Sequence, residues 1–150
     1  MAAGATIHAS CVRVGAYGVL IRGASGAGKS HLAFALILAG GRGMVPPVEL
    51  VADDRVILSR REGRLFAAAP LPLAGLIEIR GAGVRRLPFL AETSLDLVVD
   101  LGAEDAARLP EAAALRATVD GIEIQRLPAF AGGDVVQQVL ALLLAGPGPD

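Results

Sequence analysis

The chain has 150 residues, of which 53% are hydrophobic and 19% are charged, and its formal net charge is -1 at pH 7. This composition excludes a disordered chain, because so apolar a sequence buries enough surface to offset the entropy lost on ordering. The balanced charge argues against bulk attraction to nucleic acid or to an anionic membrane. A single cysteine, Cys11, excludes an internal disulfide and fits a reducing compartment. We therefore expect a cytoplasmic protein that has no nucleic-acid or membrane partner.

The first half of the chain predicts strands around a single helix. Short β-branched and apolar runs bounded by glycine or charged residues are typical of buried strands and hairpins. The helix is apolar on almost every side, and we expect it to begin near Lys29 or Ser30 and to stop at Gly40 and Gly41. The strands expected in this half are a strand or hairpin over 12–21, a buried strand over 48–52, and a hairpin with arms at 56–59 and 64–68.

The second half of the chain continues the mixture of strands and helices. Residues 104–115 have a helical composition that Pro110 divides, and 134–144 indicates an amphipathic helix capped by Asp134. Hairpins mixed with helices predict the α/β class with a mixed sheet. The strands expected in this half are at 76–79, 95–101 and 122–127.

The sequence predicts one domain and no membrane span. The domain is expected over residues 1–145, and the glycine- and proline-rich residues 146–150 are expected to form a flexible tail. The apolar runs at 32–39 and 135–145 are too short to cross a bilayer. The first 15 residues lack the basic start and long apolar core of a secretory signal.

Residues 23–30, GASGAGKS, match the phosphate-binding pattern G-x-x-x-x-G-K-[ST]. Glycines let the backbone N–H groups face phosphate oxygens, and the following helix adds the positive end of its dipole. Lys29 is the only lysine in the chain; its compact ammonium reaches the β- and γ-phosphates where a wider guanidinium would crowd the loop. The Ser30 hydroxyl can ligate Mg²⁺. The residues expected to bind phosphate are Gly23, Ala24, Ser25, Gly26, Ala27, Gly28, Lys29 and Ser30.

Two aspartates, Asp53 and Asp54, follow the predicted strand at 48–52. Acids at the end of a buried strand hold Mg²⁺ or accept a proton in phosphoryl transfer. In a loop without function such a pair is a solvated turn. The phosphate-binding pattern upstream favours the functional interpretation.

Four segments, in this order, resemble the catalytic domain of HPr kinase/phosphorylase, a bacterial protein-serine kinase. They are IHASCV at 7–12, GASGAGKS at 23–30, LVADDRV at 50–56 and IEIRGAG at 77–83. The likeness covers the first three quarters of the chain and fades beyond Leu101. It implies a short form without the N-terminal domain, and a P-loop kinase fold related to phosphoenolpyruvate carboxykinase. It also implies ATP with Mg²⁺ or Mn²⁺, a serine of HPr as acceptor, and a homo-oligomer, by family pattern a hexamer.

The resemblance implies roles for individual residues. Asp54 would take the proton of the acceptor serine and return it in the reverse reaction. Ser30 and Glu78 would hold the metal, with Asp53 supporting its water shell. The remaining implied roles are phosphate binding by Lys29, an active-site position for His8, contact with an anion or the acceptor for Arg80, and charge stabilisation on the transferred phosphoryl group by Arg108.

The residues alone leave simpler interpretations open for some of these positions. Glu78 and Arg80 alternate with isoleucines and so share one face of a strand, where they can equally form an ordinary surface ion pair. His8 has the general alternative of a surface or core residue. Arg108 has the alternative of a solvated helix residue.

The chain also departs from the family pattern. His31 follows Ser30 where family members usually carry glutamate, and the late segment 130–134 has no arginine where they carry a basic Gly-Arg loop linked to dephosphorylation. The missing arginine leaves the reverse phosphorolysis open. Two alternative functions are a P-loop small-molecule kinase or NTPase, and a non-catalytic nucleotide-binding regulator. The IEIRGAG segment favours the HPr kinase interpretation, because a generic P-loop enzyme does not need it.

Overall fold

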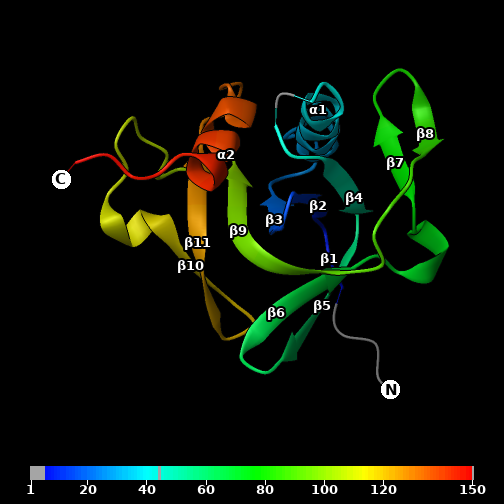
Figure 1. Cartoon of the computed structure of the whole chain (residues 1–150), viewed down its shortest axis with the longest axis horizontal. Helices are drawn as coiled ribbons and strands as arrows, with labels where there is room; N and C mark the ends of the chain where they lie inside the picture. Colours follow the sequence, from blue (N-terminus) through cyan, green and yellow to red (C-terminus); the bar gives the residue numbers. More distant parts are fainter. Residues whose placement is uncertain (1–5, 44, 150) are drawn as a thin grey trace.

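The computed structural model describes residues 6–43 and 45–149. Residues 1–5 of the predicted domain and Asp150 of the predicted tail lie outside the described residues, as does Met44. Residues 146–149 are exposed and belong to no helix or strand, and their flexibility stays a prediction. Figure 1 shows one twisted sheet with two helices packed on it.

The main sheet is mixed, as predicted. Its strands follow the order β1-β5-β6-β9-β3-β2-β4, and β11 pairs with β9 and with β10. The pairs β3–β9 and β9–β11 are parallel, and the other pairs are antiparallel. The strands are β1 (Thr6–Ile7), β2 (Ser10–Val14), β3 (Tyr17–Arg22), β4 (Val48–Ala52), β5 (Val56–Arg61), β6 (Arg64–Ala68), β9 (Thr93–Leu101), β10 (Arg116–Val119) and β11 (Ile122–Ala129).

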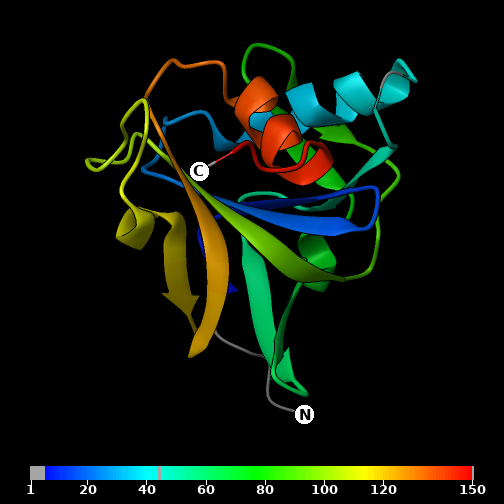
Figure 2. The same cartoon turned by 60° about the vertical axis from the view of Figure 1, so that its left-hand side comes forward.

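The two α-helices lie on the same face of this sheet, and the β5–β6 hairpin extends on the other side (Figure 2). Helix α1 (Lys29–Gly41) and helix α2 (Val135–Leu144) share a core cluster with Val19, Ile21 and Val99. Leu20 and Val98, the neighbours of those residues in β3 and β9, belong to the core on the opposite face. Both faces of the central strands are therefore buried, which explains their nearly continuous apolar sequence.

The predicted ends of both helices agree with the structure. Helix α1 begins at Lys29 and ends at Gly41, and the Asp134 carboxylate caps α2 by accepting a hydrogen bond from the Gln137 N–H at 3.3 Å. Neither helix among the described residues is long and apolar enough to cross a membrane.

The predicted helix at 104–115 is wrong. Turns and bends occupy much of 102–111, and only Ala112–Leu115 forms a short 3₁₀ helix, η2. Pro110 has no N–H to donate, and it disfavours helical geometry in the residue before it. Strand β10, which was not predicted, follows η2 directly.

A second small sheet stands beside the main one (Figure 1). Strand β7 (Leu76–Ile79) was predicted, whereas its antiparallel partner β8 (Gly83–Arg86) was not. All four residues of β8 are exposed, so no apolar alternation marked it as a strand. A short 3₁₀ helix, η1 (Leu71–Leu73), occupies the break predicted at 70–72.

An ion network joins the three strands of the parallel part of the sheet. Arg22 of β3 donates to both carboxylate oxygens of Asp100 in β9, at 2.7 and 2.8 Å. Arg126 of β11 donates to Asp100 at 2.6 Å and to Asp105 at 2.7 and 3.0 Å. Burial tends to raise the pKa of Asp100, but the hydrogen bonds and charges of Arg22 and Arg126 outweigh it and hold this pKa below its usual range.

Replacing the shared carboxylate should cost stability in a pH-dependent way. We expect Asp100→Asn to lower the free energy of unfolding by about 2 kcal/mol at pH 7, because two arginines lose their common partner. The pKa of Asp100 is lower in the folded state than in the unfolded state. Its contribution to folding stability is therefore present above the unfolded-state pKa and is lost as the pH falls through the folded-state pKa. Urea denaturation at pH 7 and at about pH 3 measures the difference in free energy of unfolding between the variant and the unmodified chain. These two pH values lie on either side of pH 4, near which an unperturbed Asp is half-ionised.

The matched control is Glu123→Gln, which breaks an exposed ion pair with Arg116 at 3.5 Å. That substitution should change stability by less than about 0.5 kcal/mol. An Asp100→Asn variant as stable as the control at pH 7 would show that the network does not contribute to folding stability.

Candidate active site

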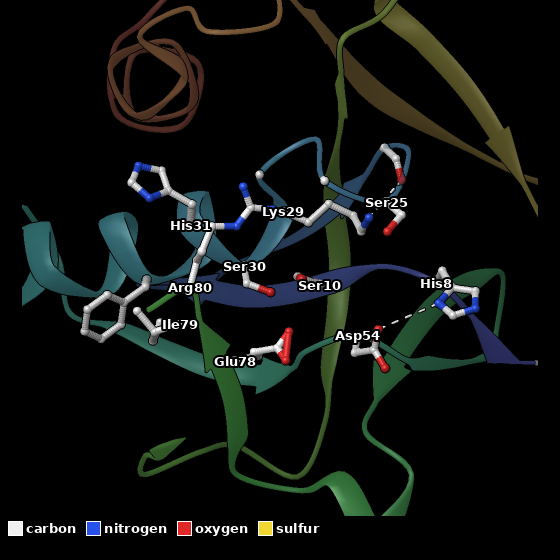
Figure 3. Close-up of a pocket in the computed structure, with 14 residues that line it drawn as sticks. His8, Ser10, Ser25, Lys29, Ser30, His31, Asp54, Glu78, Ile79 and Arg80 are labelled. Carbon is white, nitrogen blue, oxygen red and sulfur yellow. Dashed lines mark hydrogen bonds and ion pairs between the residues drawn. The ribbon is translucent and has the colours of Figure 1, made fainter. Parts of the chain in front are cut away.

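A cavity of about 700 Å³ opens at the N-terminal end of α1 (Figure 3). Its lining comes from the phosphate-binding loop, β2, α1, Asp54 and β7, so segments distant in the sequence meet there. The lining residues are His8, Ser10, Gly23, Ser25, Gly26, Gly28, Lys29, Ser30, His31, Phe34, Asp54, Glu78, Ile79 and Arg80. Most of the predicted site residues therefore share one cavity.

The loop between β3 and α1 has a conformation that depends on glycine. Gly26 and Gly28 have φ values of 83° and 98°, in the left-handed region that other residues rarely adopt. A hydrogen bond from the Ala27 N–H to the Ala24 carbonyl, at 3.0 Å, closes the turn. Gly28 is the N-cap of α1 and has no side chain to cap it. The first N–H groups of the helix therefore face a space where an anion can accept their hydrogen bonds.

The Lys29 ammonium folds back over this loop. Its Nζ donates to the carbonyl oxygens of Gly23 at 2.9 Å and of Ala24 at 3.1 Å. An ammonium has three N–H donors, so one remains for a phosphate oxygen. The only lysine of the chain is thus held at the rim of the anion site by the loop's own backbone.

Asp53 is the buried member of the acid pair, with 3% of its surface exposed. Its carboxylate accepts hydrogen bonds from the Ser10 hydroxyl at 2.6 Å, from the Ser30 hydroxyl at 2.7 Å, and from the Glu78 N–H at 3.1 Å. These donors belong to β2, α1 and β7. The carboxylate therefore ties the phosphate-binding helix to the sheet and to the small β7–β8 sheet.

Asp54, the next residue, turns toward the cavity instead. Its φ of 68° is left-handed, a conformation that aspartate tolerates better than most residues. Its side chain is 69% exposed, and its Oδ1 lies 3.8 Å from the Nδ1 of His8 (Figure 3). The reversal of the chain gives the two carboxylates different surroundings. Asp53 is hydrogen-bonded in the interior, whereas Asp54 is exposed to solvent and to any molecule bound in the cavity. Backbone strain at such a position is typical of functional sites.

Glu78 and Arg80 both line the cavity, as does Ile79 between them, and the shared strand face stays a prediction. Figure 3 shows the Glu78 side chain in the same part of the cavity as Asp54, whereas Arg80 extends toward α1. The cavity therefore has acidic groups on one side and cationic groups, Lys29 and Arg80, near the phosphate-binding loop.

Some predicted residues do not line this cavity. Arg108 is exposed in the segment between β9 and η2, and its predicted role gains no support from this geometry. Ala24 contributes a carbonyl to Lys29, and Ala27 lines a neighbouring cavity. Ser10 was missed as a site residue, although it lies inside the quoted IHASCV segment.

The oxygen-bearing side chains of the site suit a hard divalent cation. No group of three or more His, Cys, Asp and Glu side chains among residues 6–43 and 45–149 forms a metal centre by itself. The Ser30 hydroxyl and the carboxylates of Asp53, Asp54 and Glu78 are oxygen donors. Mg²⁺ commonly binds through one or two carboxylates together with phosphate oxygens and water. This donor set fits the predicted cation.

Comparison with known proteins identifies the family of the chain. A family model described as the HPr Serine kinase C-terminal domain matches residues 1–111. The chain belongs to this family. The resemblance stated from the four sequence segments is thus confirmed.

Full-length relatives in the HPr serine kinase family are much longer than this chain. It is 40% identical over 84 residues to the HPr kinase/phosphorylase of Clostridium tetani, a match that covers 56% of this chain and 25% of that protein. It is 38% identical over 104 residues to the HPr kinase/phosphorylase of Levilactobacillus brevis, covering 64% and 31% respectively. The chain therefore spans between 25% and 31% of the length of these relatives.

A solved structure of the family has the same fold over nearly the whole chain. The Hpr(Ser) kinase/phosphatase from Coxiella burnetii superposes with a TM-score of 0.74 at 25% sequence identity. The superposition covers 93% of this chain and 93% of that one. The α/β class with a mixed sheet is therefore confirmed both by the chain's own strands and by a relative.

The geometry around Lys29 predicts a specific loss of anion binding. We expect Lys29→Ala to weaken the binding of inorganic tripolyphosphate by about tenfold or more, because a charge-assisted hydrogen bond disappears. Isothermal titration calorimetry at fixed ionic strength measures the dissociation constant. The control Arg42→Ala removes a positive charge at the opposite end of α1. It should leave the dissociation constant of tripolyphosphate within about twofold of the unmodified chain's, because distant exposed charges are screened. Equal losses in both variants would contradict a local role for Lys29.

Proposed function

We propose that this chain is the catalytic domain of a protein-serine kinase that transfers the γ-phosphoryl group of ATP to a serine hydroxyl of an HPr-type phosphocarrier protein. The observation that carries the proposal is the single cavity that holds the phosphate-binding loop, Lys29, Ser30 and the exposed Asp54. Family membership and the names of the relatives support it.

The phosphate end of ATP would bind the loop and the N-terminal N–H groups of α1. Lys29 would place its ammonium on the outer phosphates. We propose that Ser30 and Glu78 hold Mg²⁺ or Mn²⁺, which would neutralise negative charge that develops during transfer. Asp53 would keep the Ser30 side chain in place through the hydrogen bond at 2.7 Å.

Asp54 would act on the acceptor. Its exposed carboxylate faces the cavity, where it can accept the proton of the incoming serine hydroxyl. The serine oxygen then forms a bond to the γ-phosphorus, the bond to the β–γ bridging oxygen breaks, and ADP leaves with that electron pair. His8, 3.8 Å from Asp54, would orient the carboxylate by charge attraction when protonated. Arg80 would contact the transferred group or an anionic group of the acceptor.

The proposal is confined to the kinase direction. The segment 130–134 contains no arginine, so this chain lacks the basic group that its resemblance would assign to reversal. We also propose a cytoplasmic homo-oligomer. For the oligomer, the support is the exposure of three leucines on the two helices: Leu38, Leu142 and Leu144 are 50%, 38% and 44% exposed.

The deciding experiment is a transfer assay. The full chain is incubated with ATP, a divalent cation and purified HPr, and mass spectrometry then locates any phosphoserine. We expect one phosphoserine on HPr in the presence of Mg²⁺ or Mn²⁺. ATP hydrolysis without phosphoserine would instead favour the small-molecule kinase or NTPase alternative, and binding without turnover would favour a regulator.

The proposed role of Asp54 is tested by measuring both the rate of HPr phosphorylation and the affinity for ATP. We expect Asp54→Asn to lower the rate of HPr phosphorylation by about a hundredfold to ten-thousandfold, the usual contribution of a general base. The affinity for ATP should change by less than about threefold, because the amide replaces a group that acts on the acceptor. Single-turnover kinetics and titration calorimetry separate the two quantities.

A matched control for this variant is Asp120→Asn. Asp120 is also left-handed, with a φ of 50°, and its 53% exposed side chain lies 3.9 Å from a cation, Arg60. It lies in the β10–β11 hairpin and does not line the cavity. Equal transfer rates in the two variants would remove Asp54 from the mechanism.

A further inference from the structure

A second cavity, of about 310 Å³, adjoins the phosphate-binding cavity. It lies between α1 and the segment that connects β11 to α2. Gly28 and His31 line both cavities, so the two spaces meet at the N-terminal end of α1. Both volumes fall in or near the range of about 300–1,000 Å³ that is usual for small-molecule sites.

The two cavities contact different faces of the same helix. Ser30 and Phe34, one turn apart, line the phosphate-binding cavity, whereas Leu32 and Ala35 line the second one. Figure 3 shows the His31 ring on the side of α1 away from Glu78 and Asp54. A molecule that extends from the first cavity into the second must therefore pass the helix N-terminus and leave the acceptor side behind.

The linings of the two cavities differ in polarity. The phosphate-binding cavity contains Lys29, Arg80, Asp54 and Glu78. The second cavity is lined mainly by alanine, glycine, leucine, valine and phenylalanine, with His31 and Asp134 as its polar side chains. Such linings suit a ligand that is anionic at one end and makes mainly apolar contacts at the other. A nucleoside triphosphate has this form.

Phe130 is the aromatic residue among those that line the second cavity. The residue is 51% exposed, so part of its surface is open to a ligand. Its backbone is held in a turn, because its carbonyl accepts the Gly133 N–H at 3.3 Å and the adjacent Ala129 carbonyl accepts the Ala103 N–H at 3.1 Å. Asp134 caps α2 immediately after this turn. The ring therefore stands on a constrained segment, which lowers the entropy lost when a base stacks on it.

We propose that the second cavity is the base subsite of the nucleotide, in which the purine ring of ATP stacks on Phe130 while its phosphates occupy the loop at 23–30. This inference rests on the proposed function for the identity of the nucleotide. Stacking on an aromatic side chain requires only the face of the base, which suits a lining with few polar groups.

The test compares ATP with inorganic tripolyphosphate, which has the phosphates without the base. Phe130→Ala should weaken ATP binding between about 5-fold and about 100-fold, the usual effect of removing a stacking partner. Tripolyphosphate binding should change by less than about twofold. Tyr17→Ala, which removes a 42% exposed aromatic ring at the start of β3, should change neither affinity.

A second variant supplies a direct readout. The chain contains no tryptophan, so Phe130→Trp introduces a single fluorophore at the proposed subsite. It should retain ATP affinity, and its fluorescence should be quenched by ATP but not by tripolyphosphate. Circular dichroism of each variant confirms that it is folded.

The outcomes separate this inference from the kinase proposal. HPr phosphorylation with unchanged ATP affinity in Phe130→Ala would overturn the base subsite and leave the kinase in place. Equal losses for ATP and tripolyphosphate would also overturn it, because they would mean a disturbed phosphate loop. If Phe130→Ala loses affinity for ATP but not for tripolyphosphate, and the unmodified chain transfers no phosphoryl group to HPr, the base subsite is supported and the kinase proposal is wrong.

Discussion

The buried carboxylate of Asp53 holds the site together. It accepts hydrogen bonds from Ser10 in β2, from Ser30 at the start of α1, and from the backbone of Glu78 in β7. A carboxylate that is 3% exposed needs such partners, because an unpaired charge is costly to bury. Its partners come from three separate elements, so the phosphate-binding helix, the sheet and the β7–β8 sheet must meet for this charge to be satisfied. The position of Glu78 and Arg80 beside the phosphate loop follows from that requirement.

Strand direction explains why the loop and the acids meet at one edge of the sheet. Strand β4 is antiparallel to β2, and β2 is antiparallel to β3, so β3 and β4 run in the same direction. Strands β9 and β11 share that direction through their parallel pairings. The segments that follow these strands therefore emerge at a common edge, which is the usual place for ligands in α/β sheets. The loop at 23–30 follows β3, Asp53 and Asp54 follow β4, and the turn that contains Phe130 follows β11.

The phosphate-binding loop, the main helices and most strands could be predicted from local patterns. The loop follows from residue identity alone, because glycine permits the φ values of 83° and 98° at Gly26 and Gly28. Strands β1, β8 and β10 were not predicted, and the helix expected at 104–115 was wrong. Strand β8 has no buried face and therefore no apolar alternation. The expected helix at 104–115 contains Pro110, and the carbonyl of Ala114 in that segment accepts a hydrogen bond from the distant Arg126.

The sequence by itself determined that a phosphate loop precedes a buried helix and that an acid pair ends a buried strand, because both depend on residue type and short-range spacing. Only the tertiary structure decided which of the two acids is buried and which faces the cavity. The left-handed turn at Asp54 sends neighbouring carboxylates in opposite directions, one into a buried hydrogen-bond network and one into the cavity. The cavity between α1 and the turn at Phe130 was likewise beyond the sequence, because strand pairing and helix packing bring together residues about a hundred positions apart.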